Sequence, residues 1–136
     1  MADVFTHEKR SAIMARIKGQ NTKPEILVRK LVHSLGYRFR LHQNTLPGKP
    51  DLVLRRHEKI IFVHGCFWHG HAGCARATVP STNIDFWQRK LQGNKKRDMS
   101  VRRKLRRKGW KILVIWQCQI RSIEDLRDRL KCFLDE

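Results

Sequence analysis

Apolar residues at helical spacing begin directly after a strong helix start at Thr22. Thr22 is a favourable N-cap, Pro24 suits the first turn, and Glu25 stands three residues after the cap. Apolar residues then recur three and four positions apart, as on one face of a helix: Leu27, Val28, Leu31, Val32 and Leu35. Because Gly36 is a typical helix stop, the pattern predicts a helix over residues 22–35.

Three stretches that follow predict the strands of a meander. Residues 37–42 alternate apolar and polar, as a half-exposed strand does, whereas residues 51–54 and 59–64 are mostly apolar, as buried strands are. Turn residues separate them at 43–50 and 56–58. In a meander the start of the second strand lies close to the end of the third.

The second half of the chain predicts two helical segments, a strand and a last helix. Ser81 or Thr82 can cap a helix that runs through Leu91, and Gly93-Asn94 is expected to bend it before a second basic stretch that ends at Gly109. Residues 110–116 form a strongly apolar strand, which can join the sheet by a crossover through these helices. Ser122 caps a last helix with one apolar face: Ile123, Leu126, Leu130 and Phe133. The layout predicts an α/β fold, a mixed sheet between helices.

Residues 1–20 predict a basic N-terminal arm on a single domain that spans residues 1–136. A short helix is expected over residues 7–18, with Met14 and Ile17 along one side, ordered on binding. A chain of 136 residues matches the length of one domain.

Charge is the strongest compositional signal. Thirty Lys and Arg against twelve Asp and Glu give a net charge of +18, which indicates a polyanionic partner. Nucleic acid is the first candidate and a membrane surface the second. No apolar run approaches the length of a membrane span, and the first residues lack a secretory signal, so we expect an intracellular protein without a membrane segment.

Cysteine and histidine spacing predicts a zinc site. Cys66, His71 and Cys74 share one loop, and Cys118 follows the last strand. Together they make a Cys3His set that suits a closed, structural zinc. His69 is an alternative to His71 as the histidine ligand, and in the alternative without metal Cys118 is a core cysteine. Cys132 is expected to be a plain thiol.

Acidic and basic groups near the same loop predict phosphodiester chemistry. Asp51 opens one strand and His64 ends its neighbour, an arrangement that can hold Mg2+ at a strand edge. Glu25 can add a second acid, and His64 and His69 have the pKa range of bases or phosphate contacts. The alternatives are that Glu25 only closes a capping box, Asp51 is a turn residue, and His64 is a satisfied strand-end histidine.

Aromatic and basic residues predict a DNA-facing surface. Twelve of the residues from Arg89 to Lys111 are Lys or Arg, and Asp98 is the one acid among them. Such residues contact phosphates and fix position rather than sequence. Large apolar side chains near charged neighbours can wedge between base steps, and three stand out here: Phe67, Trp68 and Trp87. Expected DNA contacts from the basic segment are Lys90, Asn94, Lys95 and Arg97.

From Thr6 to about Cys132 the chain resembles the very-short-patch-repair (Vsr) DNA mismatch endonucleases, bacterial enzymes of the restriction-endonuclease-like fold. The resemblance rests on Leu46-Pro47-Gly48-Lys49-Pro50-Asp51, on His64-Gly65-Cys66-Phe67-Trp68-His69, on Phe86-Trp87, on Asn94 with Arg97-Asp98, and on residues 109–116. The block His-Gly-Cys-Phe-Trp-His is highly specific.

The resemblance implies an enzyme that nicks DNA on the 5′ side of the thymine in a T:G mismatch left by deamination of 5-methylcytosine. It implies that Asp51 and the backbone carbonyl of Val63 hold catalytic Mg2+, with Glu25 orienting water around the ion. His69 would be the general base and His64 a phosphate-stabilising partner. The Cys3His set would hold zinc, while the aromatic wedges approach the mismatch from the major groove and Met14 and Ile17 from the minor groove.

The same resemblance implies the partners of the protein, and the residues also leave two other functions open. The expected partner is double-stranded DNA with a T:G mismatch, together with mismatch-repair and repair-synthesis proteins. An asymmetric mismatch favours a monomer, and the expected location is the bacterial cytoplasm, at the nucleoid. Two other functions fit the residues: a restriction-type nickase of differently specified DNA, and a non-catalytic zinc-containing nucleic-acid binder.

Overall fold

The computed structural model describes residues 22–74 and 79–136, so the N-terminal arm with Met14 and Ile17 lies outside the described residues. The elements in chain order are α2 (Lys23–Ser34), β1 (Arg40–Leu41), β2 (Leu52–Leu54), the 3-10 turn η1 (Arg55–His57), β3 (Lys59–His64), α3 (Ile84–Arg107), β4 (Lys111–Trp116), the 3-10 turn η3 (Gln117–Gln119) and α4 (Ile123–Leu134).

The four strands form one mixed sheet in the order β1-β2-β3-β4. β1 and β2 pair antiparallel, as do β2 and β3, which confirms the predicted meander. β4 pairs parallel with β3 over its full length, from Lys59 opposite Lys111 to His64 opposite Trp116. α3 is the main element of the crossover between these two strands, as parallel pairing requires.

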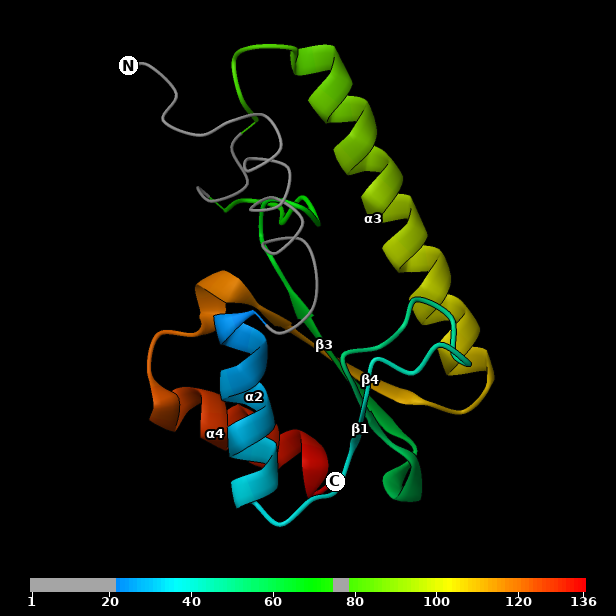
Figure 1. The fold of residues 1–136 in the computed structure, drawn as a ribbon, viewed down its shortest axis with the longest axis vertical. Helices are drawn as coiled ribbons and strands as arrows, with labels where there is room; N and C mark the ends of the chain where they lie inside the picture. The colour runs from blue at the N-terminus through cyan, green and yellow to red at the C-terminus, as the bar shows by residue number, and fades with distance from the viewer. Residues whose placement is uncertain (1–21, 75–78) are drawn as a thin grey trace, which may run out of the picture.

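Helices cover both faces of the sheet, which confirms the mixed α/β architecture. α2 and α4 lie side by side on one face (Figure 1), and their apolar faces form the larger core with Leu52, Leu54, Ile61 and Ile115. The smaller core, around Val53, Ile60, Phe62 and Leu105, lies against α3 on the other face. None of the helices in the described ranges is long and apolar enough to cross a membrane.

The predicted bend in α3 is wrong. The helix runs unbroken for 24 residues through the exposed Gly93. One glycine costs a helix only about 1 kcal/mol relative to alanine. Leu91 and Leu105, buried on either side of it, favour continuation. The start is also corrected, since the N-cap is Asn83 in the left-handed conformation (φ 57°), not Ser81 or Thr82.

The first strand is shorter than the predicted 37–42, because only Arg40 and Leu41 pair with β2. Tyr37 and Phe39 instead pack against the larger core at the end of α2 and α4. The Tyr37 hydroxyl also donates a hydrogen bond to Asp135 at the end of α4. Side-chain packing therefore replaces strand pairing in the first half of this segment.

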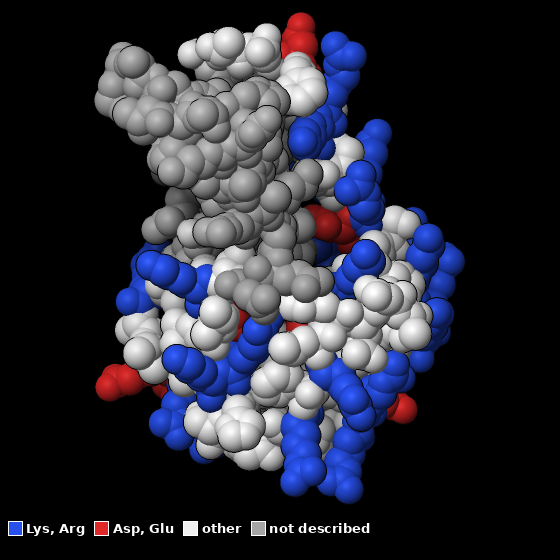
Figure 2. Space-filling model, in the orientation of Figure 1, with Lys and Arg blue, Asp and Glu red and all other residues white. Residues whose placement is uncertain are grey.

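The two ends of α3 have different surroundings. Its C-terminal part packs on the sheet, whereas its N-terminal part extends beyond the sheet (Figure 1). Lys and Arg side chains gather along the side of the molecule where α3 lies (Figure 2). The basic segment is therefore a surface ridge, and Leu91 is the buried residue of its first turns.

Candidate active site and metal centre

The N-terminus of α2, the start of β2 and the end of β3 open onto one cleft of about 940 Å3. The residues that line it include Glu25, Asp51, Val63, His64, His69 and Asp98. The antiparallel pairing of β2 and β3 explains the meeting of Asp51 and Val63, because the start of one strand lies beside the end of the other. All four catalytic residues predicted from the sequence are thus brought to one place.

The two carboxylates lie at the inner end of this cleft. The backbone N–H of Val63 donates to Asp51 Oδ2 at 2.7 Å, and Arg29 Nη2 donates to Glu25 Oε2 at 2.5 Å. His42 Nε2 lies 3.2 Å from Glu25 Oε1 and 3.8 Å from Asp51 Oδ1. Burial, and then a hydrogen bond with Glu25, raise the pKa of Asp51 to about 8. A cation between these side chains would relieve the cost of ionising both acids.

His69 and Asp98 form a close pair on the other side of the cleft. His69 Nδ1 lies 2.6 Å from Asp98 Oδ2, so Nε2 is the nitrogen left for a substrate. The His64 ring stacks on the His69 ring, with centroids 3.8 Å apart. Burial, and then the neighbouring His69, lower the pKa of His64 to about 3. His64 is therefore neutral at physiological pH and can act on a phosphate only through an N–H, not through a charge.

The four predicted zinc ligands gather outside the cleft. One ligand atom from each of Cys66, His71, Cys74 and Cys118 lies within 4.8 Å of the others. Cys118 Sγ is 3.3 Å from His71 Nδ1, and the His71 ring stacks on Trp116 with centroids 4.1 Å apart. Burial, together with the side chains of Cys118 and Cys74, raises the pKa of the Cys66 thiol to about 11, although the backbone N–H of Cys118 opposes this rise. His69, the alternative histidine ligand, points to Asp98 instead.

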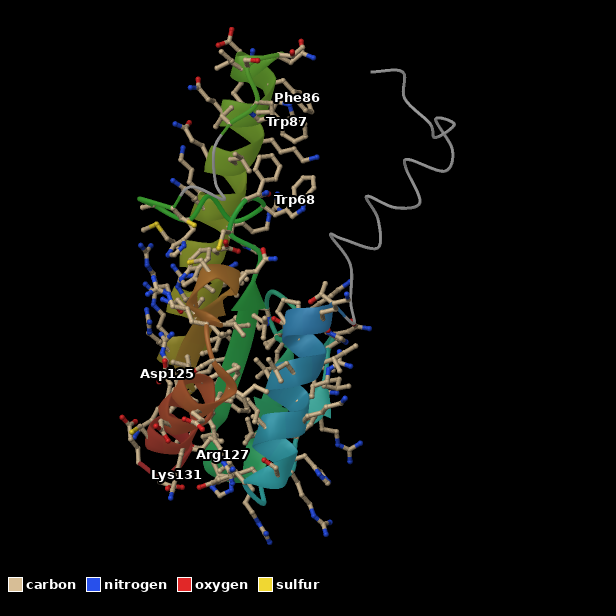
Figure 3. The ribbon with its side chains drawn as sticks, turned by 90° about the vertical axis from the view of Figure 1, so that its left-hand side faces the viewer. Trp68, Phe86, Trp87, Asp125, Arg127 and Lys131 are labelled. Carbon is tan, nitrogen blue, oxygen red and sulfur yellow. The ribbon has the colours of Figure 1, made fainter. Side chains whose placement is uncertain are left out.

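Aromatic side chains gather where the loop after β3 meets the projecting part of α3 (Figure 3). The ring centroids of Trp68 and Trp87 lie 6.1 Å apart, and Phe67 contacts both. Lys90 Nζ lies 5.5 Å from the Trp68 centroid and within 6 Å of two further rings. Asn94 Nδ2 donates to the Trp68 carbonyl at 2.7 Å, which fixes the loop to the helix.

Comparison with known proteins decides the family. The model of the family "DNA mismatch endonuclease Vsr" matches residues 2–76. DNA mismatch endonuclease Vsr of Escherichia coli is 38% identical over 94% of this chain and 81% of its own length. The chain belongs to the Vsr family of DNA mismatch endonucleases.

Two further relatives in the same size range carry the name nicking enzyme. Type II nicking enzyme V.XorIIP of Xanthomonas oryzae pv. oryzae is 43% identical over 99% of this chain and 98% of its own. Type II nicking enzyme V.NmeAIP of Neisseria meningitidis is 40% identical over the whole chain and 96% of its own. This Vsr-family chain therefore resembles both kinds of relative over nearly its full length.

Three residues at the site were not assigned a role from the sequence. Asp98 was noted as the acid within a basic run and as one residue of the family resemblance, and its contrast with the basic run could have marked it as a partner for a histidine. Phe86 is exposed and lies against Trp87. His42 was expected only as a strand residue, and its contact with Glu25 spans 17 positions of sequence. Among the predicted DNA contacts, Lys95 and Arg97 are exposed on α3, whereas Lys90 and Asn94 contact the aromatic loop.

The raised pKa of Asp51 predicts a pH-dependent stability. A carboxyl whose folded pKa is above its unfolded value stabilises the fold fully below about pH 4 and loses that contribution as the pH rises through about 8. Without added Mg2+, Asp51→Asn should therefore stabilise the protein increasingly from pH 4 to 8, on the order of 1 kcal/mol per pH unit. Urea denaturation at stepped pH measures this difference. Asp128→Asn, which alters an exposed carboxylate on α4, is the control and should show no such trend.

Proposed function

We propose that this protein is an endonuclease that nicks one strand of duplex DNA on the 5′ side of the thymine in a T:G mismatch. The observation that carries the proposal is one cleft that joins Asp51 and the buried Glu25 to the His69–Asp98 pair. An acid pair suited to a cation, beside a histidine held by a carboxylate, is what metal-assisted phosphodiester hydrolysis needs. The net charge of +18 supports a DNA substrate.

The acid side of the cleft suits Mg2+. Asp51 and the carbonyl of Val63 would hold the ion, and Glu25 would orient water around it. Bound there, the ion would supply Lewis-acid stabilisation of the charge that develops on the phosphate. The raised pKa of Asp51 supports this assignment, because a dication is the simplest compensation for two largely desolvated carboxylates that share a site.

His69 is the general base in this proposal. Asp98 holds Nδ1, so Nε2 can accept a proton from the attacking water while the water oxygen bonds to phosphorus and the bond to the 3′ oxygen breaks. The products would be a 3′-hydroxyl and a 5′-phosphate. Asp98 would stabilise the imidazolium that forms, and the stacked, neutral His64 would donate one hydrogen bond to the phosphate.

The aromatic side chains would open the duplex at the mismatch. Phe67, Trp68 and Trp87 form one apolar edge, which Lys90 flanks with a positive charge. An apolar wedge between base steps, with cations on the adjacent phosphates, can kink a duplex. A mismatched pair needs less energy to unstack than a matched pair, which favours recognition there.

A second candidate is a nickase for differently specified DNA. It is favoured by the names of V.XorIIP and V.NmeAIP, which are called Type II nicking enzymes. Both have a higher sequence identity to this chain than the Escherichia coli relative has. The two candidates share the cleft and its chemistry and differ only in the DNA that is cut.

Nicking assays on labelled duplexes separate these candidates. We expect wild-type protein with Mg2+ to nick a T:G duplex and to spare a T:A duplex of the same flanking sequence. Asp51→Ala should abolish nicking, because it removes the central carboxylate, whereas Asp128→Ala should have no effect. Nicking that survives Asp51→Ala contradicts the chemistry, equal nicking of T:A favours the second candidate, and binding without nicking in any context favours a non-catalytic binder.

Asp98→Asn should slow nicking about 100-fold or more, the usual contribution of positioned acid–base groups. The amide cannot stabilise a charged His69, but it is nearly the same size, so duplex affinity should change little. Single-turnover rates and a separate binding titration distinguish these effects. Asp85→Asn, an exposed acid at the start of the same helix, is the matched variant and should cut at the wild-type rate. A normal rate for Asp98→Asn would show that the pair is only structural.

We also propose that Cys66, His71, Cys74 and Cys118 hold a structural zinc ion. The cluster fits, because sulfurs about 2.3 Å from a tetrahedral zinc lie roughly 3.8 Å apart, within the 4.8 Å spread of these ligand atoms. Burial raises the pKa of the Cys66 thiol, and a bound zinc ion would offset this rise by favouring the thiolate. Such an ion would fasten the loop that carries Phe67, Trp68 and His69 to the end of β4.

Cys118→Ser should reduce the zinc content of the purified protein and lower its melting temperature, because closed zinc sites contribute folding energy. Elemental analysis and thermal denaturation measure the two effects. Cys132→Ser changes an exposed cysteine on α4 and should alter neither. Wild-type protein that contains no zinc when purified without chelators would rule the site out.

A further inference from the structure

His42 completes a cluster of three potential metal ligands at the inner end of the cleft. One ligand atom from each of Glu25, His42 and Asp51 lies within 4.8 Å of the others. Two of the three are carboxylates already implicated in holding a cation. The third is an imidazole, a ligand of different chemical character. Its presence bears on which cation the site prefers.

The backbone fixes His42 in this position. Its N–H donates to the carbonyl of Asp51, so His42 directly continues the β1–β2 pairing at the start of β2. It has a positive φ of 44°, in the left-handed region that is uncommon for residues other than glycine. A residue held in that region by its surroundings is a common sign of a functional position. The His42 side chain is only 13% exposed, so protein groups rather than solvent determine its position.

The distances match a shared cation. In octahedral coordination with ligands about 2.1 Å from the ion, adjacent ligand atoms are separated by about 3.0 Å. His42 Nε2 is 3.2 Å from Glu25 Oε1 and 3.8 Å from Asp51 Oδ1, so small movements suffice to place all three around one ion. Asp51 Oδ2 is occupied by the Val63 N–H, which leaves Oδ1 as the oxygen on the His42 side.

We propose that His42 is a nitrogen ligand of the catalytic cation, and that the site consequently binds a borderline dication such as Mn2+ more tightly than Mg2+. The inference rests on the proposed function, because it assumes that Asp51 holds a divalent cation. Mg2+ prefers all-oxygen surroundings, whereas imidazole is a better ligand for first-row transition metals. His42 binds from the protein side of the ion, which leaves the cleft side to DNA and water. His42 does not line the cleft, whereas Glu25 and Asp51 do.

A simpler role for His42 would be a hydrogen bond that orients Glu25. In that role the nitrogen stays protonated and never contacts the ion. Arg29 already donates to the other oxygen of Glu25, so this carboxylate has a charged partner without His42. The two roles differ in a spectroscopic property that does not depend on catalysis.

Electron spin-echo spectroscopy of Mn2+ bound to the zinc-loaded protein decides between them. A directly bound imidazole gives a nitrogen hyperfine coupling to the manganese spins. We expect that coupling in wild-type protein and in the control His33→Gln, which changes an exposed histidine of α2, and its loss in His42→Gln. Titration should also show Mn2+ affinity reduced at least about tenfold by His42→Gln, the lower limit even for residues that only orient a ligand, with a smaller change for Mg2+.

The outcomes separate failure of the inference from failure of the proposed function. If Mn2+ binds, Asp51→Ala abolishes its binding and the wild type shows no nitrogen coupling, His42 is not a ligand and the cation site stands. If Mn2+ does not bind, or binds equally well to Asp51→Ala, both the inference and the cation site are wrong. Circular dichroism of each variant establishes that it is folded, and the conservative His42→Asn provides a second variant if His42→Gln unfolds.

Discussion

The hydrogen bond from the Val63 backbone N–H to the Asp51 carboxylate holds the two halves of the cleft together. It joins the beginning of β2 to the end of β3, and both strands are buried in the centre of the sheet. The central acid, one residue before β2, is therefore positioned by two buried strands of the sheet. The same bond opposes the rise in the pKa of Asp51, although burial and Glu25 outweigh it.

β3 is the strand on which the other features depend. At its start the buried Lys59 donates to the carbonyls of Phe133, Leu134 and Glu136, and so fastens the end of α4 to the sheet. At its end the chain leads through His64 into the loop. His64 and His69 stack at the cleft, whereas Cys66, between them in the sequence, belongs to the cysteine cluster. Residues of one short loop thus contact α3 through His69 and Asp98, and η3 through Cys66 and Cys118.

Much of this organisation could be predicted from the sequence. Hydrophobic periodicity predicted α2, α4, the three longer strands and the meander of the first three strands, because each depends on local pattern. The Cys3His cluster followed from the spacing of cysteines and histidines, and the approach of Asp51 to β3 followed from the meander. The continuity of α3 was missed because Gly93 was given too much weight as a helix breaker. The burial of Leu91 and Leu105 favours a continuous helix more than one glycine disfavours it. His42 and Asp98 acquire their meaning only through contacts across 17 and 29 positions, which no local pattern records.

Under the proposed function, the projecting half of α3 separates recognition from stability. Phe86 is exposed, Trp87 only half-buried, and neither belongs to the two cores of the described chain. If these side chains contact DNA as proposed, substitutions there would alter the DNA that is chosen and leave the sheet, the acids and the histidine pair unchanged. A lineage would then diversify its targets through changes in two turns of one helix and inherit the proposed hydrolytic centre intact. The same property makes these turns the natural place to graft a new specificity onto this scaffold.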